Sequence, residues 1–351
     1  MTRRNFHHPQ LFITSLAFAL ALACALETTL ALAQDNGRFC SATAQALFIS
    51  CQNEVSDDFF KAKAICFNVS DDDAREECFA DAEEERMKSH QRCGEDRTGR
   101  RNTCKALGEG RYDPAFDPAD FDTDFTNLTH PNPYFPLGIG NRWEYQEGDE
   151  SVTVEVTDKT KSIAGVTCIV VLDRVMEDGD LVEDTDDWFA QAKNGDVHYC
   201  GEDTKESESF DGDNPRLPEL VSIDGSFKHG RDGDKSGIQF FGSPTVGQVY
   251  RQEFSVANAE DVAEVLSTSY QFGTNSELDQ FVPQDLADLL CSAGDCVVTK
   301  EFSATSGPDN FERKYYAPGL GFFLEVKSNR GKAVQLVSCN FDARCASLPT
   351  P

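Results

Sequence analysis

One short region of the chain collects side chains that could bind a small molecule. Within residues 187–202, carboxylate, indole, amide and imidazole groups lie on two expected strands that are joined by an Asn-Gly-Asp turn. Alternation along a strand would send Trp188 to one face and Asp187 to the other. The alternative is that Trp188 belongs to the core and the polar groups line a solvated face. The candidate binding site consists of Asp187, Trp188, Gln191, His198 and Glu202.

Three alternating aspartates form a candidate calcium site. Asp120, Asp122 and Asp124 offer the hard oxygen ligands that Ca²⁺ prefers. The EF-hand pattern fails, because Phe125 occupies its glycine position and Pro131 its final glutamate position. Calcium is therefore the one cofactor that the sequence suggests.

Other catalytic patterns are missing from the sequence. No two of the four histidines after residue 33 lie at metal-ligand spacing, and there is no nucleophile elbow, phosphate-binding loop or dinucleotide fingerprint. Carboxylates are so numerous that no pair singles out a glycosidase. We therefore expect a non-enzymatic protein with no catalytic residues, and a hydrolase with an unrecognised site is the alternative.

The elements that position these groups begin with a symmetric set of six cysteines. Their separations are 11, 15, 12, 15 and 11 residues, which read the same in both directions. In an antiparallel pair of helices, facing residues have a constant sum, and steps of 11 and 15 residues return to nearly the same helix face. The pattern predicts a cysteine-rich helical hairpin over residues 34–108 with the disulfides Cys40–Cys104, Cys51–Cys93 and Cys66–Cys78.

The mirror point of this hairpin falls at residue 72, so the turn should lie there. Ser70 with Asp73 resembles a capping box at the start of the second helix. The second helix is poor in apolar residues, and disulfides worth ~2–4 kcal/mol each would replace the missing core. The hairpin is either a spacer or docking arm, with Arg97, Arg100 and Arg101 on its surface, or simply a solvated helix pair.

Residues 109–140 should form an acidic linker rich in Pro, Asp and Phe, whose aromatic side chains pack on the next domain. From residue 141 to 351, short β-rich runs alternate with Asn-Gly and Asp-Gly turns, which predicts an antiparallel meander. Short helices are expected near 261–266 and 283–290. The fold class is α+β, with a mainly antiparallel curved sheet or open barrel around an aromatic core and small helices as a plug.

The later cysteines should also form disulfides. Two close pairs can seal local loops, which leaves one pair to join two strands. The expected bonds are Cys291–Cys296, Cys339–Cys345 and Cys168–Cys200.

The N-terminus resembles an export signal. Two arginines precede an apolar run from Leu11 to Leu26, and Ala31-Leu32-Ala33 suits signal peptidase, so residues 1–33 should be a signal peptide. Either the general or the twin-arginine export route fits. No later stretch is long and apolar enough for a transmembrane anchor.

Net charge argues against one class of partner. Removal of Arg3, Arg4 and Glu27 with the leader leaves 32 − 2 = 30 basic and 61 − 1 = 60 acidic residues, a net charge of −30. This charge disfavours nucleic acid and favours cations or basic partners. The alternative is that it serves solubility alone.

Several segments between residues 111 and 338 resemble a group of exported bacterial proteins. They are NPYFPLGIGNRWEYQ, DTDDWFAQ, GEDTKE, VYRQEF, AEDVAEVL, VVTKEF and KYYAPGLG. The resemblance implies a periplasmic or extracellular bacterial protein, but it implies no activity and no site residues. We therefore expect a protein that holds an apolar small molecule, a lipid or an envelope protein in its concave sheet, with a calcium-stabilised structural protein as the alternative.

Overall fold

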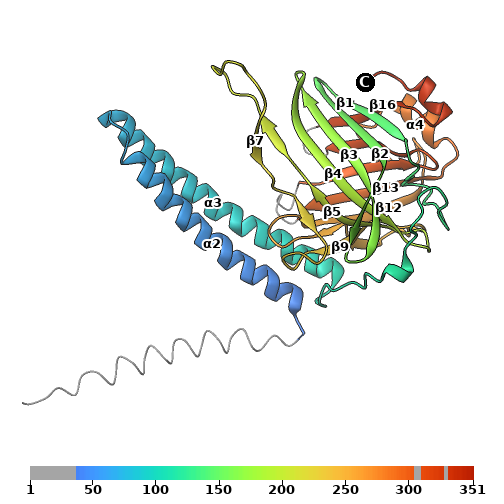
Figure 1. Ribbon diagram of the computed structural model, residues 1–351, viewed down its shortest axis with the longest axis horizontal. Helices are drawn as coiled ribbons and strands as arrows, with labels where there is room; N and C mark the ends of the chain where they lie inside the picture. The colour runs from blue at the N-terminus through green and yellow to red at the C-terminus, as the bar shows by residue number, and fades with distance from the viewer. Residues whose placement is uncertain (1–36, 304–309, 328–330) are drawn as a thin grey trace, which may run out of the picture.

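The computed structural model describes residues 37–303, 310–327 and 331–351. Its N-terminal part is a pair of long antiparallel helices, α2 (Phe39–Cys66) and α3 (Asp72–Leu107), which we call the arm. The arm projects from one side of a large curved sheet, and its turn lies far from that sheet (Figure 1). The expected signal peptide, residues 1–33, lies outside the described residues.

Three disulfides join the two helices of the arm, as the cysteine spacing predicts. The pairs are nested, and their Cα atoms are 5.6 to 5.8 Å apart. Few apolar side chains of the arm are buried, among them Ala44 and Val55 of α2 and Ala82 of α3. The disulfides therefore hold together two helices that have too thin a core to do so alone.

The start of α3 differs from the expected capping box by one residue. Asp71 is the N-cap, and its side chain accepts a hydrogen bond from the amide of Ala74 at 2.9 Å. Turn hydrogen bonds continue beyond α2 as far as Val69, whose amide donates to the carbonyl of Cys66. The turn therefore lies between Cys66 and Asp72, the expected mirror point Asp72 is already the first residue of α3, and Ser70 is left outside the helix.

Loss of the disulfide at the turn should loosen only the tip of the arm. In Cys66→Ser/Cys78→Ser, about 3 kcal/mol of local stability should be lost, because a loop of this size is no longer closed. Hydrogen–deuterium exchange should accelerate between residues 60 and 80, while the melting temperature of the barrel stays unchanged.

A matched control removes a disulfide inside the barrel. Cys291→Ser/Cys296→Ser affects two fully buried residues and should lower the barrel's melting temperature instead. Unaltered exchange at the tip of the first variant would contradict the prediction.

The rest of the chain forms one antiparallel sheet of sixteen strands that curls into a nearly closed barrel. Along the barrel wall the strands follow the order β10-β12-β13-β14-β15-β16-β1-β2-β3-β4-β5-β9-β11. The α+β class and the antiparallel curved sheet are thus confirmed. The strands of the first half are β1 (Arg142–Glu147), β2 (Glu150–Ile163), β3 (Val166–Glu177), β4 (Asp180–Gln191), β5 (Val197–Asp203), β6 (Glu206–Glu208), β7 (Glu219–Ser222) and β8 (Phe227–Lys228). Those of the second half are β9 (Lys235–Phe240), β10 (Val249–Arg251), β11 (Glu253–Phe254), β12 (Asp261–Tyr270), β13 (Cys296–Ser303), β14 (Glu312–Ala317), β15 (Gly321–Lys327) and β16 (Lys332–Cys339).

A single stretch of chain, residues 249–254, brings the two ends of the sheet together. Its first part, β10, pairs with β12, and its second part, β11, pairs with β9. Gln252 lies between them and packs against Gly237 of β9 so closely that a Cβ atom on this glycine would meet the Gln252 carbonyl oxygen at 2.0 Å. We call this contact the seam of the barrel.

The helix expected over 261–266 is wrong. Residues 261–270 form strand β12, which pairs with β10 and β13. The pattern of this segment matches a helix for only two turns, and its β-branched residues and Tyr270 favour a strand once neighbouring strands are available. The second expected helix is confirmed as α4 (Gln284–Cys291), which the disulfide Cys291–Cys296 fixes to the start of β13.

The linker covers the outside of the barrel and also enters it. Phe116 and Phe121 pack on the outer face of β3, β4 and β5, as the sequence predicts for linker aromatics. Residues 132–137, which we call the plug segment, supply lining residues to the interior cavity, whereas α4 supplies none. Helix α4 is buried in the barrel core, where Leu286, Ala287 and Leu290 pack with the strand residues, as expected of a small helical plug, but the plug segment rather than α4 lines the cavity.

A buried ion pair anchors the arm to the barrel. Arg100 of α3 donates to both carboxylate oxygens of Glu260 at 2.9–3.1 Å, and both side chains are less than a tenth exposed. Glu260 directly precedes β12, next to the seam. The arm is therefore not a fully solvated helix pair, because its base is docked.

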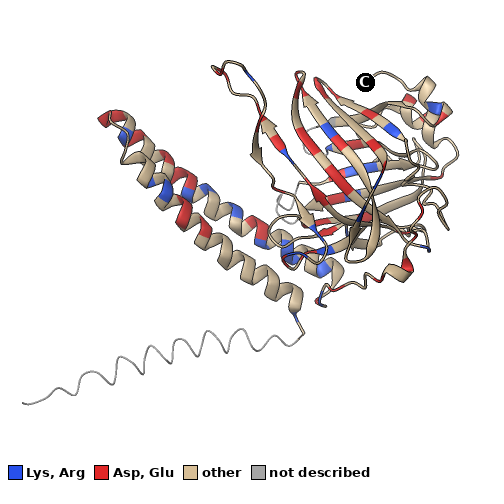
Figure 2. Ribbon diagram, in the orientation of Figure 1, with Lys and Arg blue, Asp and Glu red and all other residues tan. Residues whose placement is uncertain are grey.

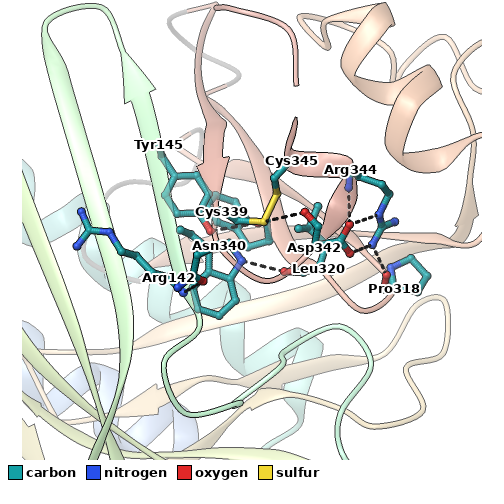
Figure 3. Close-up of a disulfide and its surroundings, with 11 residues drawn as sticks. Arg142, Tyr145, Pro318, Leu320, Cys339, Asn340, Asp342, Arg344 and Cys345 are labelled. Carbon is teal, nitrogen blue, oxygen red and sulfur yellow. Dashed lines mark hydrogen bonds and ion pairs between the residues drawn. A yellow bond between two sulfur atoms is a disulfide. The ribbon is translucent and has the colours of Figure 1, made fainter. Parts of the chain in front are cut away.

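The C-terminal residues lock β16 against the neighbouring strands (Figure 3). The side chain of Asn340 accepts from the amide of Arg142 and donates to the carbonyl of Gly140, both at 2.9 Å. The disulfide Cys339–Cys345 closes the last turn, where Arg344 pairs with Asp342 at 2.7 Å.

All six expected disulfides are present, and such a number is typical of chains that fold outside the cytoplasm. Of the helices in the described part of the chain, none is both long enough and apolar enough to span a membrane.

Candidate functional site: an acidic cavity inside the barrel

The barrel contains a cavity of about 550 Å³ that is partly open to solvent. Its apolar end is formed by the plug segment, where the buried Asn132 accepts hydrogen bonds from the amides of Tyr134 and Phe135 at 2.9 and 3.0 Å. Phe135 packs on Phe189 of β4, with their ring centroids 5.0 Å apart. A ligand in the cavity could pack on this aromatic surface.

The rest of the lining combines apolar side chains with many charged ones. On several strands the lining residues alternate, as do Glu183, Thr185 and Asp187 on β4 and Glu312 and Lys314 on β14. Figure 2 shows the acidic positions as bands across neighbouring strands. The carboxylates of the lining are Glu150, Asp173, Glu183, Asp187, Glu202, Glu253, Asp261, Glu301, Glu312 and Glu325, and the ammonium groups are Lys314 and Lys327.

The two lysines neutralise one side of the cavity. Lys314 lies 3.0 Å from Glu301 and 3.8 Å from Glu325, and Lys327 lies 2.9 Å from Glu147. Nearby negative charges, Glu301 first, raise the pKa of Lys314 well above its ordinary value although burial opposes this. Both lysines therefore stay charged and are already paired with carboxylates.

Apart from β14 and β15, the strands that line the cavity contribute no basic side chain to it in the described part of the chain. We use the name acidic wall for five carboxylates on β3, β4, β5, β11 and β12. Among the described residues, no basic nitrogen lies within 4.0 Å of a carboxylate oxygen of any of the five. The acidic wall consists of Asp173, Asp187, Glu202, Glu253 and Asp261.

Asp187 and Glu202 form the centre of this wall, since they are directly opposite each other on β4 and β5. Burial, followed by the neighbouring charge of Glu202, raises the pKa of Asp187 to about 8. Burial likewise raises the pKa of Glu202 to about 7. The hydroxyl of Tyr199 donates to Asp187, and that of Thr204 donates to Glu202 at 2.9 Å. The pair therefore holds protons near neutral pH unless a cation takes their place.

The other members of the wall are shifted in the same direction. Burial raises the pKa values of Asp173 and Glu253 well above their ordinary range, and it also raises that of Asp261. One carboxylate oxygen of Asp173 is buried without a hydrogen-bond partner among the described residues. A buried acceptor without a partner is costly, so a donor from a ligand would be stabilising here.

The structure places the predicted binding residues on two different faces of the barrel wall. Asp187 and Glu202 face the cavity, but Trp188 lies on the outer face, where Lys161 sits 3.2 Å from the centre of its ring. His198 is also outside, against Phe121 at 4.9 Å between ring centroids, and burial lowers its pKa to about 4.

Gln191 has a structural position at the end of β4. It is fully buried, and its amide nitrogen donates to the carbonyls of Ala192 and Asp196, both at 3.3 Å. The expected face of Trp188 is thus correct, but the five residues do not form one site.

Two of the three candidate calcium ligands already accept hydrogen bonds from nearby threonines. Asp122 accepts from the amide and hydroxyl of Thr129 at 2.9 and 2.6 Å, and Asp124 does the same with Thr126 at 2.9 and 2.6 Å. Asp120 is exposed. Across residues 37–303, 310–327 and 331–351, no group of three or more acidic, histidine or cysteine side chains is arranged to hold a metal. Calcium binding here stays a prediction that this geometry does not favour.

Sequence reasoning missed most of the cavity. A signal was present, because polar residues recur two apart in strand segments such as Glu183, Thr185 and Asp187. This alternation predicts a polar face, and the usual polar face of a strand is solvated. The missed residues of the cavity include Asp173, Glu253, Asp261, Glu301, Lys314 and Glu325.

Comparisons with known proteins return nothing: no family model, curated protein or solved structure matches this chain. The resemblance to exported bacterial proteins remains a prediction. The functional argument rests on the cavity itself.

Proposed function

We propose that this chain is a periplasmic or extracellular bacterial binding protein whose barrel holds a small organic cation. The ligand's ammonium, amidinium or guanidinium group would lie on the acidic wall, and its apolar part would pack on the plug segment. A cavity of about 550 Å³ falls within the usual range for small-molecule sites.

The single observation that carries this proposal is the lack of a basic partner at the acidic wall: none of its five carboxyl groups has an ion pair among the described residues, and burial raises the pKa values of all five. Desolvated carboxylates without partners are unfavourable, and a bound cation removes that penalty while forming charge-assisted hydrogen bonds. Lys314 and Lys327 are already paired with other carboxylates. The described part of the acidic wall has no basic side chain of its own that could take the place of a bound cation.

This observation changes the chemistry of the ligand that the sequence suggested. A purely apolar molecule or lipid would cover the carboxyl groups without giving them an ion-pair or hydrogen-bond partner. They would then have to stay protonated, because a buried unpaired charge is unfavourable. An organic cation with an aromatic or aliphatic body satisfies both ends of the cavity. We therefore favour it over the apolar ligand.

A hydrolase is the second candidate, and one observation supports it. Asp187 and Glu202 are adjacent, and their pKa values lie near neutral pH, as general acids and bases require. For an enzyme, Glu202→Gln would abolish turnover of a substrate that still binds. For a binding protein, the variant would weaken affinity and no substrate would be consumed.

The test is calorimetry and thermal melting at pH 7.5 with matched pairs of charged and neutral probes. Benzamidine and hexylamine should raise the melting temperature and give measurable heats, whereas benzamide and hexanol should not. Binding of the neutral probes with equal affinity, or no binding of the charged probes at millimolar concentration, would contradict the proposal.

A further inference from the structure

The outer end of the arm carries a second hollow, of about 420 Å³, which we call the tip groove. It runs between α2 and α3 near their turn. It is lined by Ala62, Ile65, Cys66, Ala74, Glu77, Cys78, Asp81, Ala82 and Glu85.

The groove exists because the side chains between its two rims are small. Ala62, Ala74 and Ala82 and the disulfide Cys66–Cys78 form its floor. Larger side chains cover the other side of the helix pair. There Phe59 lies against Lys63 and Arg86, whose charged groups are 5.2 and 4.9 Å from the centre of its ring.

The two rims of the groove differ in chemistry. Glu77, Asp81 and Glu85 follow one another at four-residue intervals, so they form a row along α3. Glu85 pairs with Arg92, but Glu77 and Asp81 have no ion pair within the described part of the chain. On the opposite rim Ile65 is 68% exposed.

We propose that the tip groove docks a basic amphipathic helix from a partner protein. A third helix would place large apolar side chains on the alanine floor and against Ile65, in the helix-in-groove mode of recognition. Its Lys or Arg residues, four apart on one flank, would face the row of carboxylates. This proposal is independent of the cavity and of what the barrel binds.

Charge decides between this occupant and a second copy of the chain. The tip is densely acidic (Figure 2), and the chain carries a net charge of −29. Two such tips would repel each other, whereas a basic helix would be attracted. The tip also projects away from the barrel, where a partner can approach it freely (Figure 1).

The experiment uses the full chain and a synthetic helical peptide of eighteen residues. The peptide carries Leu on one face and Lys at four-residue intervals on the adjacent flank, and a control peptide carries Glu in place of Lys. Affinity is measured by fluorescence anisotropy in 50 and 200 mM NaCl. Circular dichroism checks that each protein variant keeps its helices.

The variants test the floor and the rim separately. Ala62→Phe fills the groove and should abolish binding of the basic peptide. Asp81→Lys should weaken binding at least tenfold. Glu84→Lys makes the same charge change outside the groove, at a residue paired with Lys88, and should weaken binding less than twofold.

Binding of the basic peptide with these losses, weakened by salt, would support the proposal. It would be overturned by no binding, by equal binding of the acidic peptide, or by equal losses in Asp81→Lys and Glu84→Lys. Unchanged binding in Ala62→Phe would also overturn it, because the peptide would then lie elsewhere. Self-association in sedimentation experiments that Ala62→Phe abolishes would assign the groove to a second copy instead.

Discussion

Gly237→Ala is expected to prevent closure of the barrel. The new methyl group would lie 2.0 Å from the carbonyl oxygen of Gln252 and 2.2 Å from its carbonyl carbon. Both are backbone atoms of the stretch that joins the two sheet ends, so no side-chain rotation can relieve the overlap. We expect a loss of more than about 4 kcal/mol, which marks an exceptional substitution.

Chemical denaturation and the yield of folded protein measure this effect. Gly94→Ala is the matched control, because a Cβ atom at Gly94 would meet nothing within 4 Å and the residue lies within α3. Alanine should stabilise the helix there by up to ~1 kcal/mol. A Gly237→Ala protein with the wild-type unfolding midpoint would refute the close contact at the seam.

Asp187→Asn/Glu202→Gln should remove most of the affinity for organic cations and make the protein more stable at alkaline pH. Both carboxyl groups have pKa values in the folded state, about 8 and about 7, that lie above their unfolded values near 4. The folded state therefore binds protons that the unfolded state releases. Their contribution to stability is full below about pH 4 and is lost as the pH rises through 7 and 8.

The wild-type melting temperature should thus fall between pH 5 and pH 8.5, and the double variant should fall less. At pH 8 we expect the variant to melt about 5 °C higher, which corresponds to roughly 2 kcal/mol for a chain of this size. Asp173, Glu253 and Asp261 keep their carboxyl groups, so some dependence on pH remains.

The control for this variant is Asp186→Asn/Asp203→Asn. These two residues are the adjacent cross-strand pair, one position along from Asp187 and Glu202, and they line no part of the cavity. The control should leave the pH dependence and the affinity for benzamidine unchanged. Equal effects of the two double variants would show that overall charge, rather than the cavity, is responsible.

The arm could be predicted in detail because its geometry is encoded locally. Two helices of equal rise turn six cysteine positions into three facing pairs, and no distant residue is needed to derive them. What could not be predicted is the docking of Arg100 on Glu260, which are 160 residues apart. From the sequence alone, an arginine on a polar helix is expected to be solvated.

The cavity was hidden for a different reason. Alternation assigns Asp187 and Trp188 to opposite faces of β4, but it does not say which face is enclosed. The sequence favoured burial of the aromatic face alone. In the folded chain the linker covers that outer face, while barrel closure encloses the acidic one. Closure depends on contacts such as that between Gly237 and Gln252, which no local pattern reveals.

The placement of the disulfides has a consequence for how the chain matures. Every sulfur–sulfur bond of the arm lies between residues 40 and 104, whereas the barrel needs β16 to pair with β1, almost 200 residues earlier. Synthesis proceeds from the N-terminus, so oxidation of the arm can be complete while the barrel is still an open ribbon. Formation of the arm's three disulfides therefore does not depend on closure of the barrel.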